Sequence, residues 1–101
     1  MPKFNESAYI NYLRRAAGEP LLEIVGLRPG HGEREFIMVC WMGSKTVWIR
    51  FYARNVEDAR VRFHDLLSKP WLSLTTDLFG NSVPHAFDFK PSGISGFGVV
   101  D

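Results

Sequence analysis

The dipeptide Gly43-Ser44 constrains this chain most, because it stands between two runs that have the composition of β-strands. The run before it reads EREFIMVCWM, and the run after it reads KTVWIRFYA. Glycine at the first position of a two-residue turn readily takes the positive φ that a type II′ turn requires. The sequence therefore predicts a β-hairpin whose turn is Gly43-Ser44.

Counting outward from that turn fixes which side chains share each face of the hairpin. One face carries apolar cross-strand pairs, from Cys40 with Val47 to Phe36 with Phe51, and we expect it to face the core. The opposite face, here called the outer face, carries two tryptophans, a tyrosine, an arginine and two aliphatic residues: Ile37, Val39, Trp41, Trp48, Arg50 and Tyr52. Both faces are therefore predominantly apolar.

The outer face is more apolar than a sheet surface in contact with water normally is. Three explanations remain open: another element of the same chain covers it, a second subunit covers it, or it binds a ligand or nucleic acid. Tryptophan, tyrosine and arginine dominate the energetics of protein interfaces, and aromatic residues on sheets also stack on the bases of single-stranded RNA. The same register brings Glu35 near enough to Arg50 for a diagonal ion pair.

The pattern after the hairpin predicts a helix that begins at Asn55, a residue suited to an N-cap. Glu57 and Asp58 fall in its first turn, where carboxylates interact favourably with the helix dipole, and Asn55 with Asp58 resembles a capping box. The helix ends before Pro70, because the residue preceding a proline disfavours the helical conformation. Its apolar stripe is expected on the core face of the hairpin: Val56, Ala59, Phe63, Leu66 and Leu67.

The remaining segments complete a plan for a single α+β domain over 1–101. A first helix is expected over 5–17, with its apolar stripe formed by Tyr9, Tyr12, Leu13 and Ala16. Strands are expected over 21–27, which would join the hairpin as an antiparallel meander, over 71–76, and, as a short fifth strand, over 86–89. The element order is α-β-β-β-α-β, with a mainly antiparallel four- to five-stranded sheet and two helices. The apolar residues of the C-terminal tail lead us to expect that it docks on the body or on a partner subunit.

Charge and composition argue against several classes of function. A net charge of +1 is not the basic excess of a dedicated nucleic-acid-binding protein. Cys40 is the only cysteine, so the chain cannot form an internal disulfide, and no segment has the length and apolarity of a membrane span. We therefore expect a cytoplasmic protein with no membrane partner. The histidines lack the spacing of a zinc site, and we expect neither metal nor cofactor.

These observations favour binding over catalysis. The leading hypothesis is a small non-enzymatic interaction or regulatory protein that self-associates, as a homodimer, through the outer face. One alternative is a nucleic-acid-binding module that uses the same face. The other is a small-molecule-binding protein whose pocket, near the C-terminal segment, is lined by Phe79, His85, Phe87 and Phe97.

Overall fold

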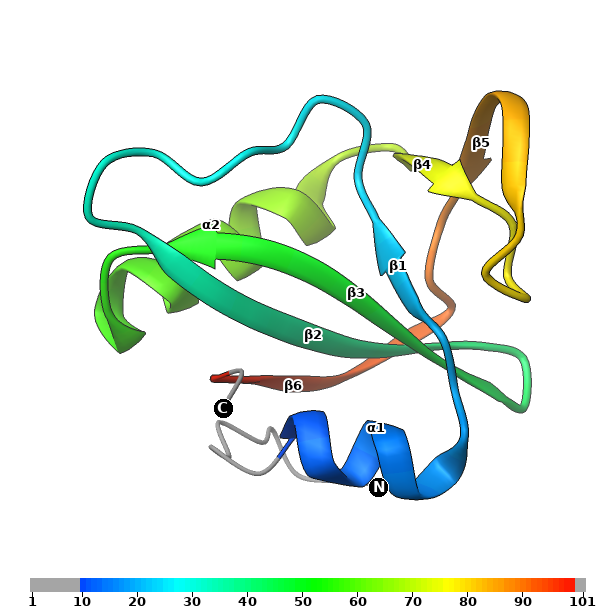
Figure 1. The fold of residues 1–101 in the computed structure, drawn as a ribbon, viewed down its shortest axis with the longest axis horizontal. Coiled ribbons are helices and arrows are strands. Elements are labelled where there is room, and N and C mark those ends of the chain that lie inside the picture. Colours follow the sequence, from blue (N-terminus) through cyan, green and yellow to red (C-terminus); the bar gives the residue numbers. More distant parts are fainter. Residues whose placement is uncertain (1–9, 100–101) are drawn as a thin grey trace.

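A computed structural model describes residues 10–99 of the chain, and these residues form two helices and six strands (Figure 1). The elements follow in the order α1 (Ile10–Ala17), β1 (Leu21–Glu23), β2 (Arg34–Met42), β3 (Lys45–Ala53), α2 (Val56–Ser68), β4 (Leu72–Thr76), β5 (Ser82–Phe89) and β6 (Gly93–Val99). The predicted α+β class with two helices is confirmed. Among the described residues, neither helix is long and apolar enough to cross a bilayer.

The β2–β3 hairpin has the predicted register along its whole length. Gly43 takes a φ of 63° at the turn, and Cys40 pairs with Val47 as the count from the turn requires. The diagonal ion pair is also present, since Arg50 Nε lies 3.7 Å from Glu35 Oε2. One two-residue turn therefore assigns every side chain of the hairpin to its face.

The predicted meander is wrong, because β1 does not pair with β2. It pairs in parallel with β3, Leu22 lying opposite Ile49, and the sheet has the order β1-β3-β2-β6. The connection over 24–33 is too long for a tight hairpin turn, and it carries the chain past β3 before β2 begins. The four-stranded sheet is consequently mixed rather than purely antiparallel, and the predicted strand over 21–27 is shortened to three residues.

The C-terminal tail docks on the body as predicted, and it does so as strand β6. This strand pairs antiparallel with β2, so that Phe97 lies opposite Met38 in the core. Gly93 lies opposite Trp41, and a Cβ atom at position 93 would come within 2.5 Å of Trp41 Cε3. Glycine is required there because the indole ring occupies the space of a side chain.

β4 and β5 form a second, two-stranded antiparallel sheet. Leu72 and Leu74 point into the core as predicted, and the strand predicted over 86–89 is the C-terminal half of the longer β5. The two sheets are joined where Ile24 bridges Leu74 and the Val25 N–H donates to the Ser73 carbonyl at 2.8 Å. The β1 edge of the main sheet is thus continued by β4.

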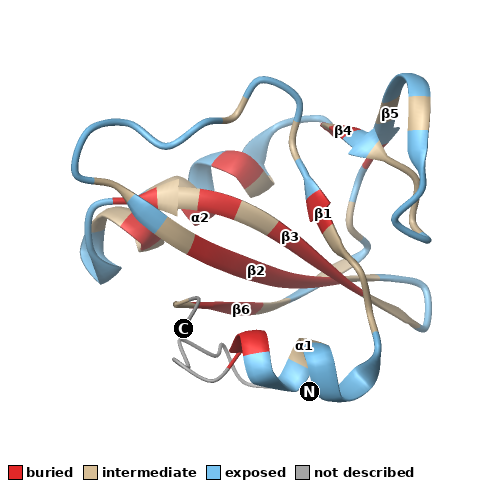
Figure 2. Cartoon of the chain, viewed as in Figure 1, coloured by how far each residue is buried: buried red, intermediate tan, exposed pale blue. Residues whose placement is uncertain are grey.

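The main core lies on the predicted core face of the hairpin, under α2 and the β4–β5 hairpin. Its centre is aromatic, with the ring of Phe63 from α2 5.1 Å from that of Phe97, and Phe97 in turn lies beside Phe36 and Phe51. In Figure 2 the buried positions accordingly concentrate along β2 and β3.

Helix α2 begins and ends where the sequence predicts. The Asn55 side chain accepts a hydrogen bond from Asp58 N–H at 2.9 Å, but the Asp58 carboxylate accepts from Arg54 N–H at 3.0 Å, so the reciprocal half of the capping box is shifted by one residue. That hydrogen bond from Arg54 lowers the pKa of Asp58. Ala59, Phe63 and Leu66 are buried as expected, whereas Val56 is exposed.

This packing predicts unequal effects of two truncations on α2. Phe63→Ala removes a fully buried ring and should lower the free energy of unfolding by about 3–5 kcal/mol. Val61→Ala, at a position that is 68% exposed on the same helix, should change it by less than about 0.5 kcal/mol. Urea denaturation measures both, and equal losses would contradict the assigned orientation of α2.

Candidate functional site

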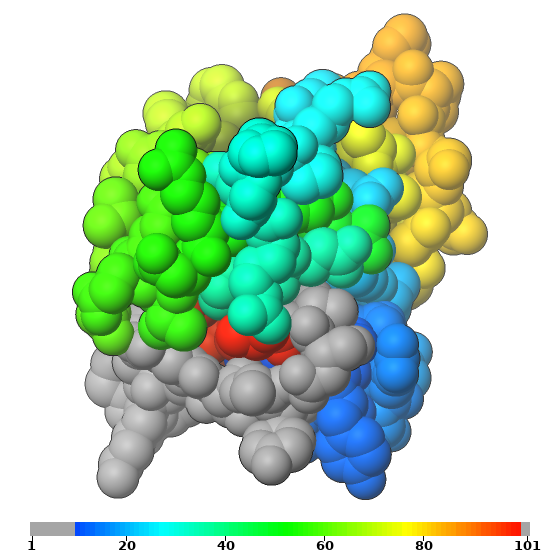
Figure 3. Space-filling model, turned by 60° about the vertical axis from the view of Figure 1, so that its left-hand side comes forward, coloured from blue at the N-terminus to red at the C-terminus, as the bar shows by residue number. Residues whose placement is uncertain are grey.

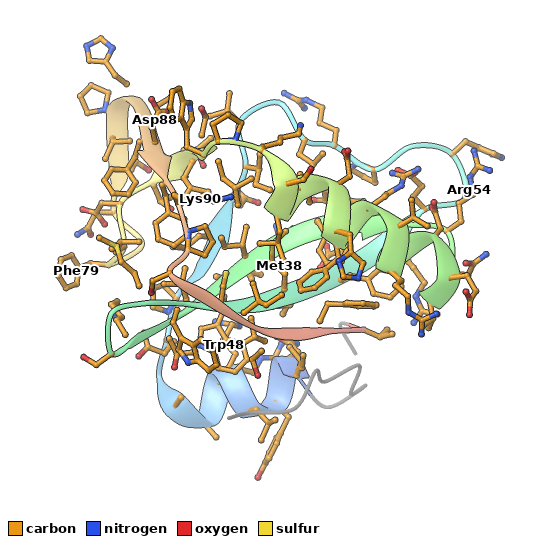
Figure 4. All side chains as sticks on the ribbon, turned by 180° about the vertical axis from the view of Figure 1, so that it is seen from behind. Met38, Trp48, Arg54, Phe79, Asp88 and Lys90 are labelled. Atoms are coloured by element: carbon orange, nitrogen blue, oxygen red, sulfur yellow. The ribbon has the colours of Figure 1, made fainter. Side chains whose placement is uncertain are left out.

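Half of the outer face is covered by the chain itself. Ile37, Val39 and Trp48 are buried in a small cluster with Ile10 of α1, and Leu21 packs at its margin. The labelled indole of Trp48 in Figure 4 lies between the sheet and α1. Of the three explanations for this apolar face, cover by another element of the same chain is therefore confirmed for these residues.

The stripe predicted for the first helix is wrong within the described residues. Ile10 and Asn11 are the buried residues of α1, while Tyr12 is 69% exposed and Leu13 and Ala16 are exposed as well. The helical positions of Tyr9 and of residues 5–8 lie outside the described residues. Apolar spacing alone did not indicate which side of α1 faces the sheet.

Two glycines of β6 explain how the helix can lie against the sheet. Gly96 and Gly98 are buried, and they lie opposite Val39 and Ile37 in the β2–β6 pairing. Because glycine has no side chain, nothing projects from the outer face at these two positions, and α1 contacts β6 there. The two glycines are visible in the sequence of the tail, but their role becomes clear only when the tail is known to form a strand.

The other three predicted interface residues, Trp41, Arg50 and Tyr52, are half-buried and do not belong to the cluster beneath α1. Arg50 is engaged by two carboxylates, from Glu23 on β1 and Glu35 on β2. The six predicted residues therefore do not form one open surface.

The four residues predicted to line a pocket are not brought together. Phe97 is buried in the main core, Phe87 packs at the margin of that core, and His85 and Phe79 are exposed. Phe97 is surrounded by the other phenylalanines of the core, so it cannot also line a cavity open to solvent.

Two shallow clefts instead adjoin each other around Leu27 and Tyr52. One, of about 260 Å³, extends to Arg62, Asp65 and Lys69 at the end of α2. The other, of about 300 Å³, is lined by charged, polar and loop residues: Glu23, Ile24, Gly26, Arg28, Pro29 and Thr75. The β1–β2 loop contributes residues to both clefts. Figure 3 shows this loop (cyan) at the surface of the molecule. The volumes of the two clefts are at the lower limit for small-molecule sites.

Three exposed apolar side chains lie at the turn end of the β2–β3 hairpin. Phe79, in the β4–β5 connection, is 75% exposed, Met42 is 45% exposed and Ile94 is 39% exposed. Met42 pairs with Lys45, whose Nζ lies 5.6 Å from the centre of the Phe79 ring. Ile94 pairs with Cys40, two residues from Met42 on the same side of the strand. We call Met42, Phe79 and Ile94 the hairpin-end surface.

The turn that presents Phe79 is held by several interactions. The Asp77 carboxylate accepts hydrogen bonds from the N–H groups of Phe79 (2.9 Å) and Asn81 (3.0 Å), and the Asp77 N–H donates to the Asn81 carbonyl at 2.9 Å. A Cβ atom at Gly80 would come within 2.7 Å of Pro20 Cβ, so the turn also lies directly against the α1–β1 linker. These contacts fix the backbone of the turn. The Phe79 side chain projects outward from it, as Figure 4 shows.

Polar contacts tie the hairpin turn to its surroundings. Lys45 Nζ lies 3.1 Å from Glu19 Oε2, and the Gly43 N–H donates to Ser92 Oγ at 3.0 Å. The Ser92 N–H in turn donates to the Trp41 carbonyl at 2.7 Å. These contacts connect the hairpin turn to the α1–β1 linker at Glu19 and to the segment before β6 at Ser92.

The only cysteine is buried, and the described residues contain no cluster of metal-ligating side chains. Burial raises the pKa of the Cys40 thiol to about 12, so the reactive thiolate is not formed at neutral pH. No group of three or more histidine, cysteine, aspartate or glutamate side chains within residues 10–99 could hold a metal ion. Comparisons with protein-family models, with curated proteins and with solved structures find no match to this chain.

The sequence singled out Phe79, but as a residue lining a pocket and not as part of an exposed surface. It did not select Met42 or Ile94, because a hairpin tip and a Gly/Ser-rich tail offered no reason to expect exposed apolar residues. The available signal was the segment from Asp77 to Asn81, in which aspartate, glycine and asparagine specify a tight turn around Phe79.

The Asp77 turn predicts a pH dependence. The hydrogen bonds from the backbone of Asn81 and then Phe79 lower the pKa of Asp77 below its ordinary value of 3.8. Because the folded-state pKa is depressed, the stabilisation is present above pH 3.8 and is lost as the pH falls through the lower folded value. An NMR titration of the side-chain carboxyl should give a midpoint below 3.8, and the Asp77→Ala variant should exchange the Phe79 and Asn81 amides faster at neutral pH. A midpoint at or above 3.8 would contradict the described turn.

Proposed function

We propose that this protein is a small non-enzymatic interaction protein that self-associates as a homodimer through the hairpin-end surface. The observation that carries the proposal is the exposure of Phe79 on a turn whose backbone is fixed by Asp77. A large apolar side chain that is held outward loses little conformational freedom on binding, and this preorganisation favours association.

The composition of the surface supports protein association. Phe79 has the aromatic character of an interface anchor, and Met42 and Ile94 supply adaptable and aliphatic area next to it. Contiguous exposed apolar groups of this kind mark interaction sites on proteins that are otherwise covered by polar residues.

The charges at its margin favour a second copy as the partner. Lys45 and Glu19 form one ion pair of opposite charges, so the surface carries no net repulsion against its own copy. In a two-fold arrangement, Lys45 of one protomer can face Glu19 of the other while the Phe79 rings meet near the axis.

A reducing cytoplasmic environment is part of the proposal. The single cysteine, Cys40, is a free thiol in the core, and the fold depends on hydrophobic burial without a disulfide.

Sedimentation equilibrium of two matched variants tests the proposed function. Phe79→Ser should weaken self-association by roughly 30-fold or more, as expected for an aromatic hot spot. Val61→Ser removes an apolar side chain of similar exposure from α2, far from the hairpin end in the sequence, and should leave the association constant unchanged.

A monomeric wild type at all accessible concentrations would overturn the proposal, as would equal weakening by both substitutions. Circular dichroism of each variant establishes that the fold is retained. Binding of a labelled oligonucleotide that weakens steeply with salt would favour the nucleic-acid alternative instead.

A further inference from the structure

Only the first turn of α1 is buried against the outer face within the described residues. Of its described residues, Ile10 and Asn11 are buried, and Ile10 contributes the one apolar side chain that joins the cluster of Ile37, Val39 and Trp48. In Figure 2 the burial of α1 is confined to its first turn. The apolar Tyr12 and Leu13 face away from the sheet.

The same interface buries N–H donors that have no acceptor. Trp48 Nε1 and Arg14 Nε are inaccessible to solvent and lack a hydrogen-bond partner among residues 10–99. A buried donor without an acceptor loses its hydration and gains nothing in return. Separation of α1 from the sheet would return both donors to water, which reduces the net benefit of docking.

Charge also opposes close docking. Desolvation lowers the pKa of Arg14, and the neighbouring charges of Arg15 and Arg50 lower it further. The hydrogen-bond acceptors of Arg14 are neutral, namely the Glu19 carbonyl at 2.7 Å and Asn11 Oδ1 at 3.4 Å. The carboxylates of Glu23 and Glu35 are bound to Arg50 and not to Arg14.

The main core does not depend on α1. Its buried residues come from the strands and from α2, and none belongs to α1. Gly18, with a φ of 71°, Glu19 and Pro20 link the helix to β1, so a few linker residues can absorb a change in its position. The helix can therefore leave the outer face without opening the core.

We propose that α1 undocks as a unit from a sheet that stays folded, and that the face it uncovers, formed by Ile37, Val39 and Trp48, binds the α1 helix of a second copy. A second α1 makes the same contacts as the first, so the exchange needs no new complementary surface. The choice of a second copy rests on the proposed self-association, whereas the undocking of α1 is independent of it.

Trp48 reports undocking directly. In a Trp41→Phe, Trp71→Phe variant, Trp48 is the remaining tryptophan of the three in the chain. Acrylamide should begin to quench its fluorescence at urea concentrations well below the transition seen by circular dichroism, because local opening precedes global unfolding. Coincident transitions would overturn the undocking of α1.

A fluorescent peptide of residues 1–20, added to full-length protein, tests whether a second α1 can replace the chain's own α1. The peptide competes with the tethered helix of the chain, so Ile10→Ala in the chain should strengthen peptide binding by roughly tenfold or more. Tyr12→Ala in the chain, at an exposed position of the same helix, should leave binding unchanged, and a peptide with Ile10→Ala should not bind.

Failure of this proposal is separable from failure of the proposed function. The exchange is overturned if the peptide does not bind, or if it binds the wild-type and Ile10→Ala chains equally. This holds even if Phe79→Ser abolishes dimerisation. Peptide binding should persist in the Phe79→Ser chain, because Phe79 is not in the cluster beneath α1. Loss of peptide binding in that chain, with its fold retained, would also contradict the assigned face.

Discussion

Gly43 takes a φ of 63° between β2 and β3, and the register that this turn imposes determines how the rest of the chain packs. It directs Phe36 and Phe51 to one side of the sheet and Val39 and Trp48 to the other. Helix α2 and the β4–β5 hairpin cover the core side, α1 covers the outer side, and β6 extends the sheet beside β2. A shift of one residue would exchange the faces and leave α2 facing the indoles.

The two faces are covered to very different extents. The core face meets a long helix, a second sheet and the ring of Phe97, and its side chains are almost completely buried. The outer face meets a helix that contributes Ile10 and leaves Trp48 Nε1 without an acceptor. Stability is therefore expected to be concentrated in the core layer, with α1 as the element that opens at the lowest free energy.

Local sequence rules predicted those parts of the fold that local interactions specify. The hairpin register followed from Gly43, and the start of α2 followed from Asn55, because each depends on neighbouring residues. The parallel pairing of β1 with β3 did not follow from the sequence, because no residue within 24–33 specifies which edge of the sheet β1 joins. The same limit applied to the glycines of β6, whose role appears only when the strand lies beside β2.

The candidate site was predictable in composition but not in location. The sequence indicated that aromatic residues would be found outside the main core, and it singled out Trp41, Trp48 and Phe79. It could not indicate that α1 buries Trp48 while Asp77 holds Phe79 outward, because both outcomes depend on contacts between distant segments. Exposure, rather than aromatic content, distinguishes the proposed binding surface from the covered one.

Dilution of the isotopically labelled protein, followed by NMR, tests the central claim most directly because it locates the contact surface residue by residue. Self-association through the hairpin-end surface predicts concentration-dependent shifts that centre on Phe79, Met42 and Ile94, with smaller changes along α1. Shifts that centre instead on the clefts around Leu27 and Tyr52, or spectra that do not change with concentration, would contradict it.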